Sequence, residues 1–225
     1  DFPYRQAVGA LMYLMLGTRP DLAYTVGFLS RTLEKPLAKD IIRIKRVFRY
    51  IAGTIDLCIS YNKNAKCESE CYSDADFGGC LTTGRSTSGV VINYAGGAIS
   101  WMSQRQTIVA TSTTEAEIIA ATEAAKEIIW LSRLYSEDVK LKNIPLLHVA
   151  NAAAVRLSQN PESHRRTKHI AIKHFFVREK VVERKLDVQQ ISTRNQVADI
   201  MTKPLQPIRL KLLCSMLGLQ NANSK

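Results

Sequence analysis

The sequence predicts an α/β fold in which a mixed five-stranded sheet with flanking helices follows a small helical segment. Apolar residues recur at helical spacing through residues 1–57, and a polar stretch at residues 62–70 then interrupts the pattern. Beyond it, short runs with strand-like alternation surround a long helical stretch and alternate with further helices. Three antiparallel strands followed by strands reached through helical crossovers produce a mixed sheet.

Three helices are expected in residues 1–57, at Tyr4–Leu16, Pro20 to about Leu33, and Lys39–Ala52. Thr18 provides a capping residue before the second helix, and Pro20 suits its first turn. The third helix has apolar residues along one stripe and four Arg or Lys residues on its other face. That basic face is either a solvated surface or a nucleic-acid contact, and the pattern alone favours neither.

Five strands are expected in the sheet, with bounds Cys71–Asp76, Thr87–Tyr94, Ala98–Ser103, Ile144–Ala150 and Leu186–Ser192. Glycines mark the turns between the first three strands, which are therefore expected to form an antiparallel meander. The last two strands are short runs that are separated by helical sequence. They are expected to join the sheet through crossover connections.

The helices around these strands are predicted at about Thr114–Tyr135, Asn151–Gln159, Thr167–Arg184, Gln196–Thr202 and Ile208–Leu217. Pro204 separates the last two, and the tail QNANSK is expected to be disordered. The chain is thus predicted to consist of a helical segment at 1–57, an α/β domain at 66–205, and a C-terminal helix with its tail at 206–225.

The charge balance predicts a polyanionic partner. The formal net charge is +11, from 31 Lys and Arg against 20 Asp and Glu, and basic side chains that neutralise phosphates release counterions. No apolar run approaches the roughly 18–20 residues of a membrane span, so no membrane partner is expected. The five cysteines show no repeated spacing and the N-terminus has no signal-peptide pattern, which favours free thiols and an intracellular location.

Isolated acids on separate elements are the candidates for chemistry. Hydrolysis of a phosphodiester with two magnesium ions needs several carboxylates on one patch. Asp74 and Asp76 lie on the first strand and, at a period of two, point to the same face. Glu117 shares the sheet-facing stripe of the long helix, whereas Glu115 in its first turn is expected to interact with the helix dipole. Asp199 lies near the start of a later helix.

Seven motifs occur in one order: YSDAD, RSTSG, AISWMSQRQ, STTEAE, AAKEIIWLSRL, RTKHI and ADIMTKPL. In this order they resemble the ribonuclease H domain of copia-type retrotransposon Pol polyproteins over about residues 66–205. YRQAVGALMYL, RPDLAY and KRVFRYIAGT resemble the helical, thumb-like end of that family's reverse transcriptase. The resemblance implies a ribonuclease H-like fold and degradation of the RNA strand of RNA–DNA hybrids. It also implies association with the palm and fingers of the same polyprotein, in the cytoplasm or in a virus-like particle.

Carried over by position, the resemblance implies that Asp74 bridges two Mg2+ ions while Glu117 and Asp199 each bind one of them. The fourth ligand of the family is an Asp that is followed by Asn at the end of the fourth strand. Here Ala150 precedes Asn151, so one metal ligand is lost. No other acid lies between residues 138 and 162 that could replace it.

Contacts with nucleic acid are expected mainly from the basic helix. Residues 164–185 contain eight Lys or Arg and two acids, and Arg166, Lys168 and Lys173 are the predicted backbone contacts. Arg85 in a turn and Asn151 beside the lost ligand are further candidates.

Two functions remain open from the sequence: a ribonuclease H impaired at Ala150, and an inactive nucleic-acid-binding remnant or domesticated fragment of the same fold. An integrase-like nuclease is disfavoured, because it would need an acid at the position of Ala150.

Overall fold

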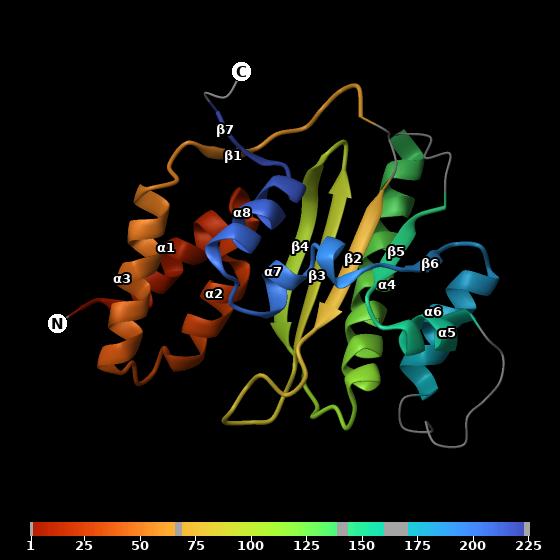
Figure 1. Ribbon diagram of the computed structural model, residues 1–225, viewed down its shortest axis with the longest axis horizontal. Coiled ribbons are helices and arrows are strands. Elements are labelled where there is room, and N and C mark those ends of the chain that lie inside the picture. Colours follow the sequence, from red (N-terminus) through yellow and green to blue (C-terminus); the bar gives the residue numbers. More distant parts are fainter. Residues whose placement is uncertain (1, 66–68, 139–143, 160–170, 223–225) are drawn as a thin grey trace.

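The computed structural model describes residues 2–65, 69–138, 144–159 and 171–222 (Figure 1). Its main sheet contains β2 (Glu70–Ala75), β3 (Thr87–Tyr94), β4 (Gly97–Arg105), β5 (Leu146–Val149) and β6 (Asp187–Gln190). The strand order is β4-β3-β2-β5-β6. The pairs β2–β3 and β3–β4 are antiparallel, and β2–β5 and β5–β6 are parallel. The predicted mixed five-stranded sheet is confirmed.

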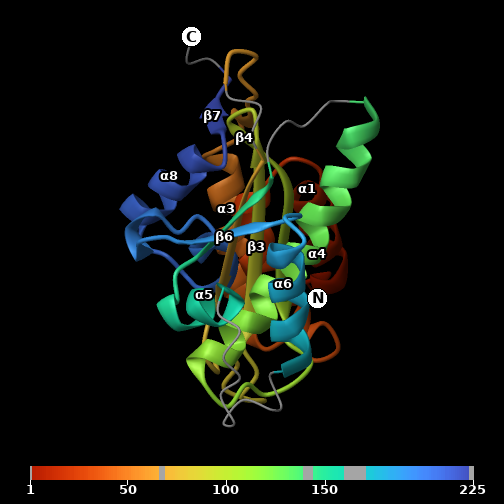
Figure 2. The same ribbon diagram turned by 90° about the vertical axis from the view of Figure 1, so that its right-hand side faces the viewer.

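One face of the sheet is covered by the long helix α4 (Thr113–Asp138). Ala121, Ala124 and Ile128 of α4 are almost completely buried against Cys71, Val90 and Ile92 of the sheet, as the sequence pattern predicted. The helices α5 (Ala152–Gln159) and α6 (Ala171–Val182) extend this layer and pack against α4. Figure 2 shows α4 and α8 (Pro207–Met216) on opposite sides of the sheet.

The opposite face is covered by α8 and by the short helix α7 (Asp199–Thr202). Gly89 of β3 allows α7 to lie directly on the sheet. A Cβ atom at Gly89 would lie 2.7 Å from both Met201 Cβ and Thr202 Cγ2, and 2.9 Å from the carbonyl oxygen of Ala198. Gly89 is also the partner of Asp74 across the β2–β3 ladder. The absence of a side chain at Gly89 therefore allows α7 to lie beside Asp74.

The N-terminal segment contains α1 (Tyr4–Gly17), η1 (Pro20–Leu22), α2 (Ala23–Leu29), η2 (Ser30–Thr32) and α3 (Ala38–Ala52). Of the single helix expected from Pro20 to Leu33, only the middle part, α2, is α-helical, and a 3-10 turn lies at each of its ends. The segment has its own core and also packs on the sheet. Ala23 belongs to the apolar cluster beneath α7 and α8, and Trp101 Nε1 of β4 donates a 2.9 Å hydrogen bond to the carbonyl of Met15.

A second, two-stranded sheet joins the segment after α3 to the C-terminal end of the described chain. β1 (Leu57–Ile59) pairs in antiparallel fashion with β7 (Leu219–Asn221), and the N–H of Ala222 donates to the carbonyl of Asp56 at 2.9 Å. The prediction of a disordered tail was therefore wrong for Gln220 and Asn221. They pair with Cys58 and Leu57, which lie 162 and 164 residues away in sequence, and local composition could not indicate such partners.

The start of the helix predicted at Thr167–Arg184 lies outside the described residues, which contain α6 from Ala171 onward. Other boundaries differ modestly from the sequence prediction. The helix expected at 196–202 begins only at Asp199 and is preceded by the 3-10 turn η4 (Thr193–Asn195). No helix in the described part of the chain combines the length and the apolar character that a bilayer crossing needs. Because α8, β7 and α2 of the N-terminal segment all contact the main sheet or its apolar cluster, the three-part division of the chain stays a prediction.

Candidate active site

Three acids from three separate elements converge at the middle of the sheet. Asp74 lies in β2, Glu117 on α4 and Asp199 at the start of α7, and each residue is at most 8% exposed. The ammonium of Lys203 lies 3.4 Å from Asp74 Oδ2 and 2.7 Å from Asp199 Oδ1. Below, Asp74, Glu117 and Asp199 are called the carboxylate cluster. Buried acids are costly unless cations or hydrogen bonds compensate them, so this arrangement is not explained by packing alone.

Glu117 is the least compensated member of the cluster. Burial, together with the charges of Asp74 and Asp199, raises the pKa of Glu117 to about 8, although Lys203 and the N–H of Ala75 oppose the shift. Its Oε2 atom is buried and accepts no hydrogen bond from any described residue. An unpartnered buried carboxylate oxygen is an expected ligand for a cation.

Asp74 is held more firmly. The hydroxyl of Thr202 donates a short hydrogen bond to Asp74 Oδ2, and Lys203 forms the ion pair described above. Burial raises the pKa of Asp74 and Asp199 adds to this, while Lys203 and Thr202 act in the opposite direction. Burial by itself lowers the pKa of Lys203, but Asp74 and Asp199 more than offset this and raise it. Lys203 therefore carries its positive charge in the site.

The strand register places Ala150 next to Asp74. Ser73 of β2 pairs with Val149, the last residue of the parallel strand β5, so the next position pairs Asp74 with Ala150. Side chains alternate along strands. Two residues earlier, the rings of Tyr72 and His148 stack on the same face of the sheet, with centroids 4.8 Å apart. A carboxylate at residue 150 would therefore join the face that carries Asp74.

The other acids of these motifs have separate roles. β2 ends at Ala75, and the carboxylate of Asp76 accepts the N–H of Thr87, so of the two acids in YSDAD only Asp74 joins the cluster. Glu115 Oε2 accepts hydrogen bonds from the N–H and the hydroxyl of Thr111, at 2.6 and 2.7 Å. Its own N–H donates to Ser112 Oγ at 3.1 Å, an N-terminal capping arrangement.

The predicted nucleic-acid contacts are only partly described. Asn151 Oδ1 caps α5 by accepting the N–H groups of Ala153 and Ala154 at 2.8 and 3.1 Å. Arg85 is half-buried in the β2–β3 loop, and Lys173 is half-buried on α6. Arg166 and Lys168 lie outside the described residues. The contact role of all five stays a prediction.

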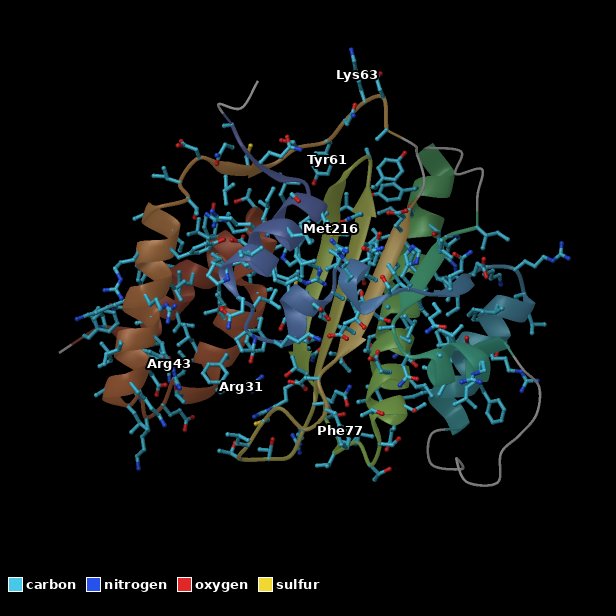
Figure 3. The ribbon with its side chains drawn as sticks, in the orientation of Figure 1. Arg31, Arg43, Tyr61, Lys63, Phe77 and Met216 are labelled. Atoms are coloured by element: carbon cyan, nitrogen blue, oxygen red, sulfur yellow. The ribbon has the colours of Figure 1, made fainter. Side chains whose placement is uncertain are left out.

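Basic and aromatic side chains of the helical segment lie near the start of β3. Arg31 donates a 3.3 Å hydrogen bond to Thr87 Oγ1, and the guanidinium groups of Arg31 and Arg43 lie 5.5 and 5.2 Å from the ring centroid of Phe28. Figure 3 shows Arg43, Arg31 and Phe77 in the lower half of the molecule, with Phe77 at its lower edge. Phe77 is 54% exposed. This edge adjoins the end of β2 that follows Asp74.

Sequence reasoning missed Lys203 and Thr202, although both belong to the motif ADIMTKPL. A Lys four residues after an Asp on a helix is an ordinary sign of an i,i+4 ion pair. That spacing alone could have placed Lys203 beside Asp199. The contact of both residues with Asp74 depends on how α7 lies on β3, which is a tertiary feature.

No family model matches the chain. The chain is 39% identical over 219 residues to the Retrovirus-related Pol polyprotein from transposon TNT 1-94 of Nicotiana tabacum. This match covers 97% of this chain and 16% of that protein. It is 37% identical over 216 residues to the corresponding polyprotein from transposon RE1 of Arabidopsis thaliana. This match covers 96% of this chain and 15% of that protein.

Among solved structures, the chain resembles LC11-RNase H1, which was isolated from compost by a metagenomic approach. The two are 20% identical with a TM-score of 0.44, and the match covers 60% of this chain and 93% of that chain. A score this low adds nothing to the fold assignment, which rests on the strand order and register of the sheet. Together with the near-complete coverage by the transposon sequences, that topology identifies the chain. It belongs to the copia-type retrotransposon Pol polyproteins and corresponds to a segment of them that contains a ribonuclease H-like domain.

Proposed function

We propose that this chain is the ribonuclease H of its Pol polyprotein, and that loss of one carboxylate at Ala150 impairs its cleavage of RNA in RNA–DNA hybrids. The carboxylate cluster carries the proposal. Asp74, Glu117 and Asp199 are distant in sequence, and yet they meet in the interior, where three acids have no structural reason to gather. The proposal is limited to this segment, because the chain spans 16% of the TNT 1-94 polyprotein.

The cluster fits Mg2+ in its donor chemistry. All three side chains offer hard carboxylate oxygens, which Mg2+ prefers, and Glu117 Oε2 accepts no hydrogen bond from any described residue. As the side chains lie, no three His, Cys, Asp or Glu groups among the described residues are close enough to hold an ion together. Lys203 instead holds two of the carboxylates. When bound, Mg2+ would polarise the scissile phosphate and lower the pKa of an attacking water.

The residues of the chain have distinct tasks in this proposal. Asp74, fixed by Thr202 and by its pairing with Gly89 near the end of the central strand β2, would be the shared ligand. Glu117 and Asp199 would bind on either side of it. Since an ionised Glu117 is disfavoured by its burial, cation binding and its loss of a proton should occur together. The cluster would thereby hold negative charge only where the metal compensates it.

The hybrid would be bound by basic side chains around the cluster. The net charge of +11 provides a general attraction for a phosphate backbone. Arg31 and Arg43 lie at the edge next to the end of β2, and Lys173 lies on α6. Because Arg31 contacts Thr87 directly, we place the helical segment and the sheet on one continuous binding surface.

An inactive nucleic-acid-binding remnant is the second candidate, and the position of Ala150 favours it. A methyl group next to Asp74 cannot ligate a metal, and two closely spaced divalent ions need more negative charge than three carboxylates supply. The two candidates share the fold and the binding surface. They differ in whether magnesium-dependent cleavage persists.

The test is a hybrid-cleavage assay in Mg2+ on three proteins: the unmodified chain, Ala150→Asp, and the double variant Ala150→Asp with Asp74→Asn. The impaired-enzyme proposal predicts weak cleavage by the first, which rises by orders of magnitude in the second and is lost in the third. Complete inactivity of the first two would support the remnant. Cleavage by the unmodified chain at the rate of Ala150→Asp would show that residue 150 is not a ligand position.

We also propose that the chain acts inside the cell, in the cytoplasm or in a virus-like particle, as the Pol family suggests. Cys58, Cys71, Cys80 and Cys214 are free thiols in the structure, which suits a reducing compartment. Immunolocalisation of the polyprotein with particle fractions would test this placement.

A further inference from the structure

Lys203 occupies the space between two members of the carboxylate cluster. Its ammonium lies 2.7 Å from Asp199 Oδ1 and 3.4 Å from Asp74 Oδ2. The side chain of Lys203 is 41% exposed, whereas those of Asp74 and Asp199 are 6% and 7% exposed. A partly exposed basic side chain thus enters from the surface and places one positive charge between two buried acids.

The second cation near the cluster is bound differently. Arg209 NH2 lies 3.3 Å from Asp199 Oδ2. Its guanidinium also donates to the carbonyl oxygens of Arg194, Thr193 and Gln196, so Arg209 is fixed by the backbone around η4. Asp74 receives no ion pair from Arg209 in the described structure. Lys203 is therefore the cation that joins the two carboxylates.

From this geometry we infer that Lys203 is a tethered cation that competes with the divalent metal for Asp74 and Asp199. The inference rests on the proposed metal-binding function of the cluster. A metal ion shared by the two carboxylates needs the oxygen atoms that Lys203 now contacts, and an ammonium at this distance repels a divalent ion. Metal binding therefore requires Lys203 to move outward, toward the solvent from which its side chain enters.

The inferred role has two consequences of opposite sign. Without metal, Lys203 stabilises the fold, because it offsets the repulsion between two buried carboxylates. With metal, it weakens binding, because its displacement is part of the binding equilibrium. A purely structural lysine would show the first effect alone. A lysine that positions the ligands for the metal would show weaker metal binding after its removal.

The experiment measures Mn2+ binding by isothermal titration calorimetry, and thermal unfolding in EDTA and in Mn2+, on the whole chain. Lys203→Gln is compared with the unmodified chain, with Lys203→Arg, and with Lys126→Gln as the matched control. Lys126 forms a 3.0 Å ion pair with Glu123 on the surface of α4, and its side chain is 55% exposed. Its loss should change neither measurement, since exposed pairs contribute little.

We expect Lys203→Gln to bind Mn2+ at least about tenfold more tightly than the unmodified chain, which corresponds to about 1.4 kcal/mol. In EDTA, Lys203→Gln should unfold at a lower temperature than the unmodified chain. Addition of Mn2+ should raise its unfolding temperature by more. Lys203→Arg, which keeps the charge, should bind Mn2+ as weakly as the unmodified chain. Equal or weaker Mn2+ binding by Lys203→Gln would overturn the inference.

Ala150→Asp separates this outcome from failure of the proposed function. If Ala150→Asp binds Mn2+ and Lys203→Gln brings no gain, the cluster is a metal site and only the role of Lys203 is wrong. If none of the variants binds Mn2+, including Ala150→Asp, both the inference and the proposed metal chemistry are wrong.

Discussion

Replacing Glu117 by Gln should make the protein more stable at neutral and alkaline pH in the absence of metal. The pKa of Glu117 in the folded chain is about 8, against an ordinary value of 4.5. The folded state thus binds a proton that the unfolded state has already released between these two pH values. The stabilisation that protonated Glu117 contributes to the folded state is fully present below about pH 4.5 and is lost as pH rises through about pH 8. Glutamine has no such proton to lose.

The size of the effect follows from the pKa difference. At about 1.4 kcal/mol per pH unit, the gap between 4.5 and about 8 sets an upper bound of about 5 kcal/mol for the destabilisation by ionised Glu117. Relaxation of the site and water entry will reduce this, so we expect about 2–4 kcal/mol at about pH 9.

Urea unfolding in EDTA from about pH 5 to about pH 9 measures the difference between Glu117→Gln and the unmodified chain at each pH. Taking the difference removes the contribution of groups that titrate in the same way in both proteins. Saturating Mg2+ should restore part of the lost stability to the unmodified chain and little to the variant. Parallel stability curves across this pH range would refute the burial argument for Glu117.

The other predictions concern packing, a buried ion pair and binding. Gly89→Ala should lower the free energy of unfolding in urea by about 1–3 kcal/mol, because its Cβ would meet α7. The control Gly9→Ala, whose Cβ has nothing within 4 Å, should be neutral or stabilising. Equal urea midpoints for the two variants would contradict this. Asp21→Ala should cost about 3–5 kcal/mol, since it leaves Arg19 buried without its 2.8 Å partner, and a loss below about 1 kcal/mol would contradict it. Charge reversal at Arg166, Lys168 and Lys173 should weaken hybrid binding and lower its salt slope by about 0.9 per lost contact; unchanged binding in a salt titration would refute these contacts.

Much of the fold could be predicted because local patterns agreed with the tertiary structure. The stripe through Glu117, Ala121, Ala124 and Ile128 does face the sheet, because a helix repeats every 3.6 residues. The antiparallel meander followed the glycine turns. The pairing of β1 with β7 was missed, because each strand has three residues and its partner is far away in sequence. Such short strands have no periodicity to detect.

The acidic residues of the candidate site could be predicted from the sequence, but its basic residue Lys203 could not. Asp74, Glu117 and Asp199 could be selected through the family motifs, and the structure brings them together. Strand alternation left Asp76 as an equal candidate, because the end of β2 at Ala75 cannot be read from sequence. The contact between Lys203 and Asp74 depends on the close approach of α7 to β3 at Gly89. That approach is a property of packing and leaves no local signal.

In the proposed site, Asp74, Glu117 and Asp199 bind metal, and the missing ligand belongs at residue 150. Anomalous X-ray diffraction from Mn2+ in crystals of Ala150→Asp tests it most directly, with crystals of the unmodified chain as the control. We expect an anomalous peak that is coordinated by Asp74 and by the introduced carboxylate, and a weaker or single peak at the carboxylate cluster in the unmodified chain. Manganese bound elsewhere in Ala150→Asp, with the carboxylate cluster empty, would show that these carboxylates are not the metal site.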